Sequence, residues 1–401
     1  MSSSRVCLAF AALLPAALAC QSPPVASPAP PQPAGASSSG VSAGPAPAGG
    51  ATGAAPVSVA TLPGRIFVEQ RNATKLLNVD FVLENRSAEA WTISALEVLV
   101  YDRRGALALR KFINGNGFNP GVRTLPDRRI EPGGSIAVFN PFYAFDAEVE
   151  LADVRFEFTF EAADGEREMK LEARVRPEEY VGRAELGLPM RGRLIVHDGH
   201  DFYSHHRRVD VTHPAAKQFG VRHNFSRYSY DFCAVDAAGA LYRGAGERNE
   251  DWYSFGAPVV APAAGTVAAA FDGVDDNEHG APPRLRPESL RENPMALFGN
   301  YVIVDHGGGE HSLFAHLRRG SLRVARGDRV ARGAPLAKAG ASGDAGNPHL
   351  HYELRAGAGP EAEGRPSYFR DFTRLLGSTR VRVRRGQVDS GDVLLAGPEG
   401  R

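Results

Sequence analysis

The chain is poor in cysteine, with three in 401 residues, and only Cys233 lies beyond residue 20. A disulfide framework is therefore excluded, and stability has to come from ordinary apolar cores. An excess of one charge is also missing, because 46 basic residues are matched by 46 acidic ones. This balance gives no reason to expect nucleic acid as a partner, since phosphate backbones select basic surfaces.

Two common hydrolase signatures are absent as well. No HExxH occurs, which excludes a helical zinc site with a glutamate base, and no GxSxG occurs to support a serine nucleophile. Cys233 lies in the apolar run YDFCAV, where we expect a small core residue and not a nucleophile. Any hydrolytic chemistry has to come from other side chains.

Histidine has the most informative distribution. All twelve histidines lie between His197 and His351, so the first 196 residues have none. In PHLHYE, His349 and His351 are two positions apart in a β-prone run, and both side chains should face the same side of a strand. Two imidazoles on one face can hold a metal ion, or one can hold it while the other transfers protons. A solvent-exposed pair on an edge strand is the alternative for an isolated HxH.

Three motifs follow one another from Gly256 onward: GAPVVAPAAGTV, GNYVIVDHGGGEHSLFAHL and VARGDRVARGAPLAKAGASGDAGNPHLHYEL. Together they resemble the lysostaphin/LytM-type zinc endopeptidases, which cleave the peptide part of bacterial peptidoglycan. The resemblance covers about residues 190–395 and implies a β-sheet domain with Zn²⁺ as cofactor. GDRVARGAPL also resembles the hairpin of lipoyl-type carrier domains, but such domains have no use for an HxH.

In this family the zinc ion is held by a histidine, an aspartate and the second histidine of the HxH. The resemblance places the last two at His351 and at Asp231, in RYSYDF. The commonest family pattern has its first histidine four residues before the aspartate, where this chain has Arg227. Relatives with a long loop between the ligands carry that histidine in an HRR-type run. This favours His206 as the remaining ligand, with His223 as the alternative.

The same resemblance implies that His316, in FAHL, and His349 are the catalytic residues. One would act as the base, and the other would stabilise the tetrahedral intermediate or protonate the leaving amine. Three protein ligands leave the fourth tetrahedral position of zinc open, as in catalytic sites. Strand alternation also places Glu353 on the face of His351, where it could contact a ligand imidazole. His200 has no motif around it, and we expect it to be a surface or loop residue.

The N-terminus indicates export. One arginine is followed by VCLAFAALLPAALAC, which is too short to span a bilayer, so residues 1–19 are predicted to be a signal peptide. Ala-Leu-Ala before Cys20 resembles a relaxed lipobox, which would attach lipid to this cysteine; ordinary cleavage after AxA is the alternative. Residues 20–62 are rich in Pro, Ala, Ser and Gly and are predicted to be a disordered tether. We therefore expect a membrane-anchored lipoprotein of a bacterial cell envelope, in the periplasm or outer membrane.

Residues 63–182 have the alternation of β-strands. VRFEFTFE places Val154, Phe156, Phe158 and Phe160 on one face, and MKLEARVR repeats the pattern after an Asp-Gly turn. Evenly spaced short strands predict an immunoglobulin-like or fibronectin-like β-sandwich. The expected fold is all-β, with this sandwich followed by a LytM-type zinc endopeptidase domain.

We expect that second domain to occupy residues 183–395. The segment 272–294, rich in Pro, Asp, Glu and Arg, interrupts it and is expected to wall a substrate groove. The leading functional hypothesis is a secreted zinc metalloendopeptidase acting on peptidoglycan stem peptides or cross-links. A catalytically silent LytM-type activator of a cell-wall amidase is the alternative, because the first histidine is displaced. A zinc peptidase acting on proteins outside the wall is a third hypothesis.

Overall fold

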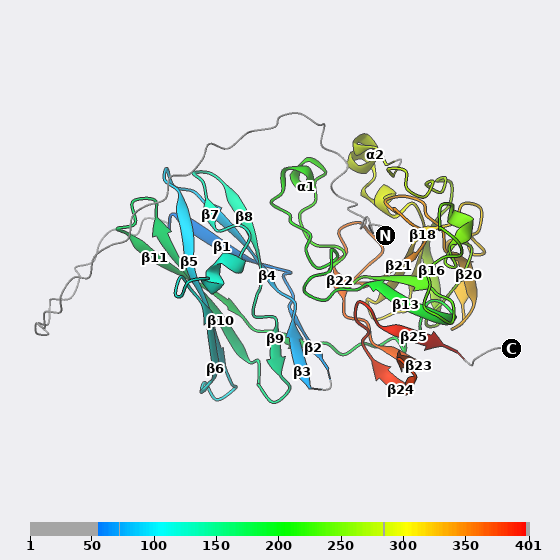
Figure 1. The fold of residues 1–401 in the computed structure, drawn as a ribbon, viewed down its shortest axis with the longest axis horizontal. Coiled ribbons are helices and arrows are strands. Elements are labelled where there is room, and N and C mark those ends of the chain that lie inside the picture. The colour runs from blue at the N-terminus through cyan, green and yellow to red at the C-terminus, as the bar shows by residue number, and fades with distance from the viewer. Residues whose placement is uncertain (1–54, 72, 284, 398–401) are drawn as a thin grey trace, which may run out of the picture.

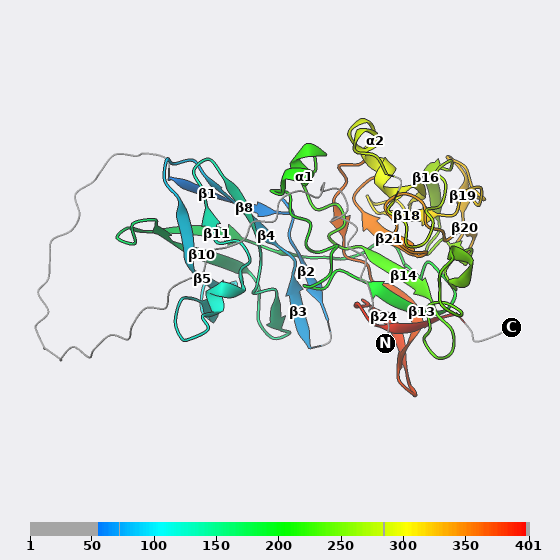
Figure 2. The same cartoon turned by 45° about the horizontal axis from the view of Figure 1, so that its top comes forward.

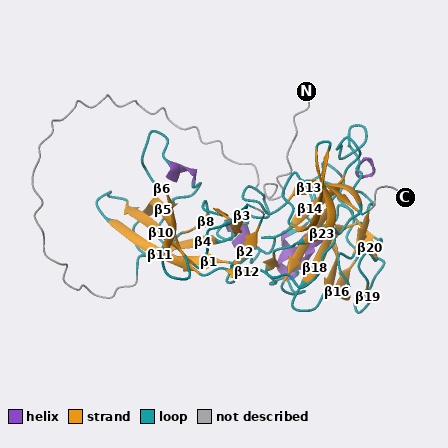
Figure 3. Ribbon diagram, turned by 90° about the horizontal axis from the view of Figure 1, so that it is seen from below, coloured by secondary structure: helices purple, strands orange, loops and turns teal. Residues whose placement is uncertain are grey.

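The computed structural model describes residues 55–71, 73–283 and 285–397. This part of the chain contains 25 strands, two short α-helices and three short 3-10 helices, so the expected all-β class is confirmed. Strands dominate both of the bodies that the chain forms (Figure 3). None of the helices described is long and apolar enough to cross a membrane. The predicted signal peptide and Cys20 lie outside the described residues.

The N-terminal body extends from β1 to β12. Its elements are β1 (Val57–Leu62), β2 (Phe67–Gln70), β3 (Thr74–Leu77), β4 (Asp80–Asn85), β5 (Trp91–Tyr101), β6 (Leu107–Ile113), η1 (Gly121–Thr124), β7 (Arg129–Ile130), β8 (Ser135–Phe139), β9 (Ala144–Asp146), β10 (Asp153–Ala162), β11 (Glu168–Val175) and β12 (Glu178–Glu179). They form three sheets with the strand orders β1-β4-β8, β11-β10-β5-β6 and β12-β2-β3-β9, and β7 pairs with β5.

Aromatic side chains join the first two of these sheets. The ring of Phe81 in β4 lies 4.8 Å from that of Phe156 and 5.0 Å from that of Phe158, both in β10. The alternation expected for β10 is confirmed, because Val154 and the three phenylalanines that follow it at every second position are fully buried. Two sheets therefore enclose one apolar core.

The tether ends earlier than expected. Residues 57–62 form β1, which pairs with β4 and buries Val57 in the core of the N-terminal body. The expected limit at residue 62 was wrong because VSVATL has the small-residue composition of the tether. The alternation of its side chains specifies a strand only when β4 lies beside it and pairs with it.

The C-terminal body extends from β13 to β25. Its elements are β13 (Gly192–Asp198), α1 (Pro214–Gln218), β14 (Tyr230–Ala234), η2 (Asn249–Asp251), β15 (Pro258–Val260), β16 (Gly265–Phe271), α2 (Pro287–Glu292), η3 (Pro294–Phe298), β17 (Asn300–Asp305), β18 (His311–Leu317), β19 (Arg329–Val330), β20 (Pro335–Lys338), β21 (Leu350–Arg355), β22 (Gly364–Arg365), β23 (Phe369–Leu376), β24 (Thr379–Gly386) and β25 (Val393–Ala396). Helix α1 stands between the two bodies in Figures 1 and 2.

One large antiparallel sheet organises this body. Its strand order is β19-β16-β17-β18-β21-β14-β13-β25-β23-β24, with β22 paired to β21, while β15 and β20 form a separate pair. One face of the central strands packs into the core, where the ring of Tyr352 lies 5.6 Å from Phe314 and 6.4 Å from Phe232. Side chains at alternate positions of β18, β21 and β14 therefore meet on the opposite face.

Candidate metal centre

Three of the residues expected to bind metal meet on that opposite face. Asp231 in β14 is directly paired with His351 in β21, and His206 approaches from the loop between β13 and β14. Oδ1 of Asp231 lies 3.1 Å from Nδ1 of His351 and 3.4 Å from Nε2 of His206. One ligand atom from each residue lies within 4.8 Å of the other two. All three are buried, with exposed fractions of 2% for His206, 6% for Asp231 and 5% for His351.

Hydrogen bonds orient the two imidazoles. Nδ1 of His206 donates to the carbonyl of Gly199 at 2.8 Å, and Nε2 of His351 donates to Oε1 of Glu353 at 2.9 Å. Each ring therefore directs its other nitrogen toward Asp231. Histidines that bind metals typically donate their second N–H to a carbonyl or carboxylate. Two imidazoles and one carboxylate in this arrangement fit a zinc ion.

The two histidines expected to be catalytic lie beside this cluster. Nε2 of His349 is 3.5 Å from Oδ1 of Asp231, and the ring of His316 is 4.9 Å from that of His349. Nδ1 of His349 donates to the carbonyl of Asn347 and Nδ1 of His316 to that of Ser342, both at 2.8 Å. Because Nδ1 makes the backbone hydrogen bond in both rings, Nε2 is the nitrogen that can exchange a proton.

His316 has an unusual backbone conformation. Its φ is 57°, in the left-handed region that residues with a side chain seldom adopt, although it lies within β18. Local strain of this kind persists where the surroundings determine it, and it is frequent at functional sites. The conformation turns the end of β18, so that the ring lies against His349 and His351.

Burial governs the charges in the cluster. Burial, reinforced by His349 and His351, lowers the pKa of His316 well below 6.5, and burial also lowers the pKa of His349. Burial opposes ionisation of Asp231, but His206 and His349 outweigh it and hold the pKa of this carboxyl well below 3.8. At neutral pH the cluster therefore presents an anionic ligand and two neutral imidazoles that can accept protons.

His351 differs from the other two histidines. Burial would lower its pKa, but the hydrogen bonds with Asp231 and Glu353 outweigh burial and raise it to about 9. A metal ion bound by Nδ1 would replace a proton there, so binding would release that proton.

The alternative ligand and one other histidine lie elsewhere. His223 belongs to neither group of potential ligand atoms, and its Nδ1 lies 3.4 Å from Oε2 of Glu361. His200, expected to be a surface or loop residue, lies in the loop after β13 but is buried: Nε2 lies 2.7 Å from Oε2 of Glu69 in the N-terminal body. No local pattern reveals this burial, because the partner lies 131 positions away in the sequence.

Sequence reasoning missed two residues beside the cluster. Asp198, the last residue of β13, pairs with Asp231 in the sheet and accepts a hydrogen bond from Nδ1 of His205. Asp198, His205 and His206 form a second group whose potential ligand atoms lie within 4.8 Å of one another. Only the pairing of β13 with β14 brings Asp198 here, and the sequence has no signal for that register.

The interrupting segment continues into the site. Segment 272–294 contains α2 and ends at the first residue of η3. In η3, the ring of Phe298 lies 5.8 Å from that of His351. The guanidinium of Arg355 lies 5.7 Å from the centre of the Phe298 ring. Phe298, just after the segment expected to wall a groove, therefore packs against one of the residues expected to bind metal.

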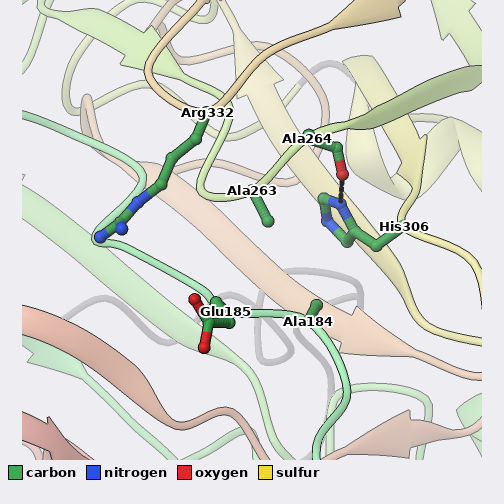
Figure 4. A pocket seen from close by; sticks show the side chains of 6 residues that line it. All are labelled: Ala184, Glu185, Ala263, Ala264, His306 and Arg332. Carbon is green, nitrogen blue, oxygen red and sulfur yellow. Dashed lines mark hydrogen bonds between the residues drawn. The ribbon is translucent and has the colours of Figure 1, made fainter.

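A separate cavity of about 310 Å³ lies beside the turn after β17 (Figure 4). None of the five histidine and aspartate residues of the cluster lines it. His306, on its wall, is held by the carbonyl of Ala264 at 2.9 Å and by Oγ of Ser312 at 2.8 Å. Both ring nitrogens are thus engaged in structural hydrogen bonds.

The chain is similar to known proteins over part of its length. Residues 252–363 match the model of peptidase family M23. Peptidoglycan DD-endopeptidase ShyA of Vibrio cholerae is 39% identical over 64 residues, which cover 16% of this chain and 14% of ShyA. Murein hydrolase activator EnvC of Escherichia coli is 40% identical over 58 residues, which cover 14% of this chain and 13% of EnvC.

Among solved structures, the catalytic domain of the prophage-encoded M23 protein EnpA from Enterococcus faecalis is 22% identical, with a TM-score of 0.21, and the match covers 34% of this chain and 73% of that one. The chain spans only 14% and 13% of the lengths of ShyA and EnvC. The segment matched by the family model includes His316, His349 and His351, whereas His206 and Asp231 precede it. The match to peptidase family M23 thus confirms the resemblance to the lysostaphin/LytM-type family over residues 252–363.

Proposed function

We propose that this protein is a zinc metalloendopeptidase that hydrolyses peptide bonds in the stem peptides or cross-links of bacterial peptidoglycan. The observation that carries the proposal is the convergence of His206, Asp231 and His351 with His316 and His349 on one face of the sheet. The similarity to a DD-endopeptidase supports the substrate class.

The residues divide into two roles. Nε2 of His206, a carboxylate oxygen of Asp231 and Nδ1 of His351 would hold the zinc ion, which supplies a Lewis acid and lowers the pKa of a bound water. Nε2 of His316 and of His349 can accept a proton from the attacking water and return it to the leaving amine. An imidazole that has gained a proton can also donate a hydrogen bond to the oxygen on which negative charge develops.

The hydrogen bonds within the site support this division. The carbonyls of Asn347 and Ser342 accept from Nδ1 of the two catalytic histidines, so their Nε2 atoms are unprotonated before reaction. The rings need no reorientation at the moment of proton transfer, which is the advantage of a preorganised site. The lowered pKa of His316 and of His349 favours this neutral form.

An activator without catalytic function is the second candidate, favoured by the similarity to EnvC, a murein hydrolase activator. This hypothesis arose because the first histidine is displaced. Arg227 lies four residues before Asp231, where the commonest family pattern has that histidine. His206 compensates for that displacement by approaching Asp231 from the preceding loop. A complete set of ligands favours the enzyme over the activator.

Export and lipid attachment at Cys20 remain part of the proposal. They are supported by the apolar N-terminal segment and by the relaxed lipobox. An envelope location would place the enzyme beside its polymeric substrate.

The test compares zinc content and the digestion of purified sacculi for the wild type, His206→Ala, His351→Ala and His223→Ala. We expect about one zinc per wild-type chain, as a mononuclear site requires, together with release of peptide fragments. The first two variants should lose both properties, and His223→Ala should keep both. A wild type that binds no zinc and digests nothing, yet stimulates a purified amidase, would establish the activator instead.

A further inference from the structure

A carboxylate of the N-terminal body lies between two arginines of the C-terminal body. Asp80, the first residue of β4, accepts hydrogen bonds through Oδ2 from Nη1 of Arg207 and, at 2.6 Å, from Nη1 of Arg227. The side chains of Asp80, Arg207 and Arg227 are only 7%, 2% and 3% exposed. The triad is a deeply buried charged contact between the two bodies.

Both arginines are close in sequence to proposed metal ligands. Arg207 directly follows His206, and Arg227 precedes Asp231 by four residues, just before β14. One carboxylate of the N-terminal body therefore holds the loop between β13 and β14 at two points, each beside a ligand.

Further hydrogen bonds make the attachment specific. Nη2 of Arg207 donates to the carbonyl of Val79 at 3.3 Å, and Nη1 of Arg227 donates to Oδ1 of Asn78 at 3.0 Å. Inside the loop, Nδ2 of Asn224 donates to the carbonyls of His206 and Arg207, at 2.8 and 3.2 Å. A displacement of Arg207 would thus be transmitted directly to the backbone of His206.

The loop has little regular structure of its own. Between β13 and β14 only α1, with five residues, is helical, and no strand is described there. Without Asp80, two guanidinium groups would be buried with no carboxylate to neutralise them, and buried unpaired charges drive rearrangement. The orientation of His206 therefore depends on the N-terminal body.

We propose that Asp80 is a positioning residue of the metal centre, through which the N-terminal body holds His206 in its ligand geometry. This inference rests on the proposed function, because it concerns the same zinc site. It makes the N-terminal body a structural part of that site, in addition to any binding role it has.

Asp80→Asn in the full chain tests the inference, because it removes the charge and keeps the shape. Zinc affinity is measured by competition with a chromophoric chelator, and kcat and KM are measured at limiting and saturating zinc. We expect zinc affinity to fall about 10- to 100-fold, as when a group that orients a metal ligand is lost. KM should stay unchanged, kcat should recover at saturating zinc, and Asp80→Glu should restore part of the affinity.

Asp389→Asn is the matched control. It removes the carboxylate from the ion pair with Arg71, which also joins the two bodies. Asp389 belongs to neither group of potential ligand atoms, so its loss should leave zinc affinity unchanged. Wild-type affinity in Asp80→Asn would overturn the inference while leaving the proposed function intact. If Asp80→Asn does not fold, Arg207→Lys is titrated in its place, and wild-type affinity there would also overturn it. A wild type without zinc would overturn the inference and the proposed function together.

Discussion

The carboxylate of Glu353 accepts a hydrogen bond from Nε2 of His351 at 2.9 Å, while Nδ1 of the same ring lies 3.1 Å from Asp231. Glu353 is itself almost completely buried. One imidazole is thus held between two carboxylates, of which one would share the metal ion and the other orients the ring.

Glu353→Gln should weaken zinc binding about 10- to 100-fold, because the amide is a weaker acceptor for the Nε2 proton and orients the ring less firmly. The measurement is chelator competition on the purified chain. Glu361→Gln is the control, since Glu361 lies beside His223 and is largely exposed. Equal zinc affinity in the two variants would contradict the proposed role of Glu353.

His316→Ala and His349→Ala should retain zinc and lose turnover. Neither residue belongs to the ligand group, and both present Nε2 for proton transfer. Loss of a general acid or base lowers kcat by about 10²- to 10⁴-fold. Release of muropeptides from sacculi, normalised to bound zinc, checks this expectation. Loss of zinc from either variant would show that the residue is a ligand.

The contact between the two bodies should weaken in acid. Burial would raise the pKa of Asp80, but Arg207 and Arg227 outweigh it and lower the pKa below its usual value of 3.8. The stabilisation by this carboxylate is therefore fully present above pH 3.8 and is lost as the pH falls through the lower pKa of the folded state.

Urea unfolding of the wild type and of Asp80→Asn, followed over that pH range, checks this dependence. The wild type should be the more stable at neutral pH, and the difference should shrink on acidification. A difference that stays constant down to the lowest pH would show that ionisation of Asp80 does not stabilise the fold.

Phe156→Ala should destabilise the N-terminal body by about 3 to 5 kcal/mol, because it leaves a cavity between two sheets that pack closely. Phe156 is fully buried against Phe81. Phe118→Ala is the matched control at a fully exposed phenylalanine and should change the free energy of unfolding by less than about 0.5 kcal/mol. Chemical denaturation measures both. Similar losses in the two variants would contradict the described core.

Local patterns in the sequence determined the strands and the face on which each strand side chain lies. The alternation around Phe156 predicted a buried face, and the spacing of His349 and His351 placed both imidazoles together. These predictions succeeded because the side chains of a strand alternate with a period of two residues, whatever the strand packs against.

Tertiary structure decided the contacts that cross the sequence. His206 and His223 lie in a loop without periodicity, and only the folded chain brings His206 to Asp231. The contact of Asp80 with Arg207 joins residues 127 positions apart, and the strand pairing that brings Asp198 to Asp231 is likewise not encoded in either segment alone. Residue order specifies local geometry, whereas the partners of a loop or a buried charge depend on which surfaces the whole chain packs together.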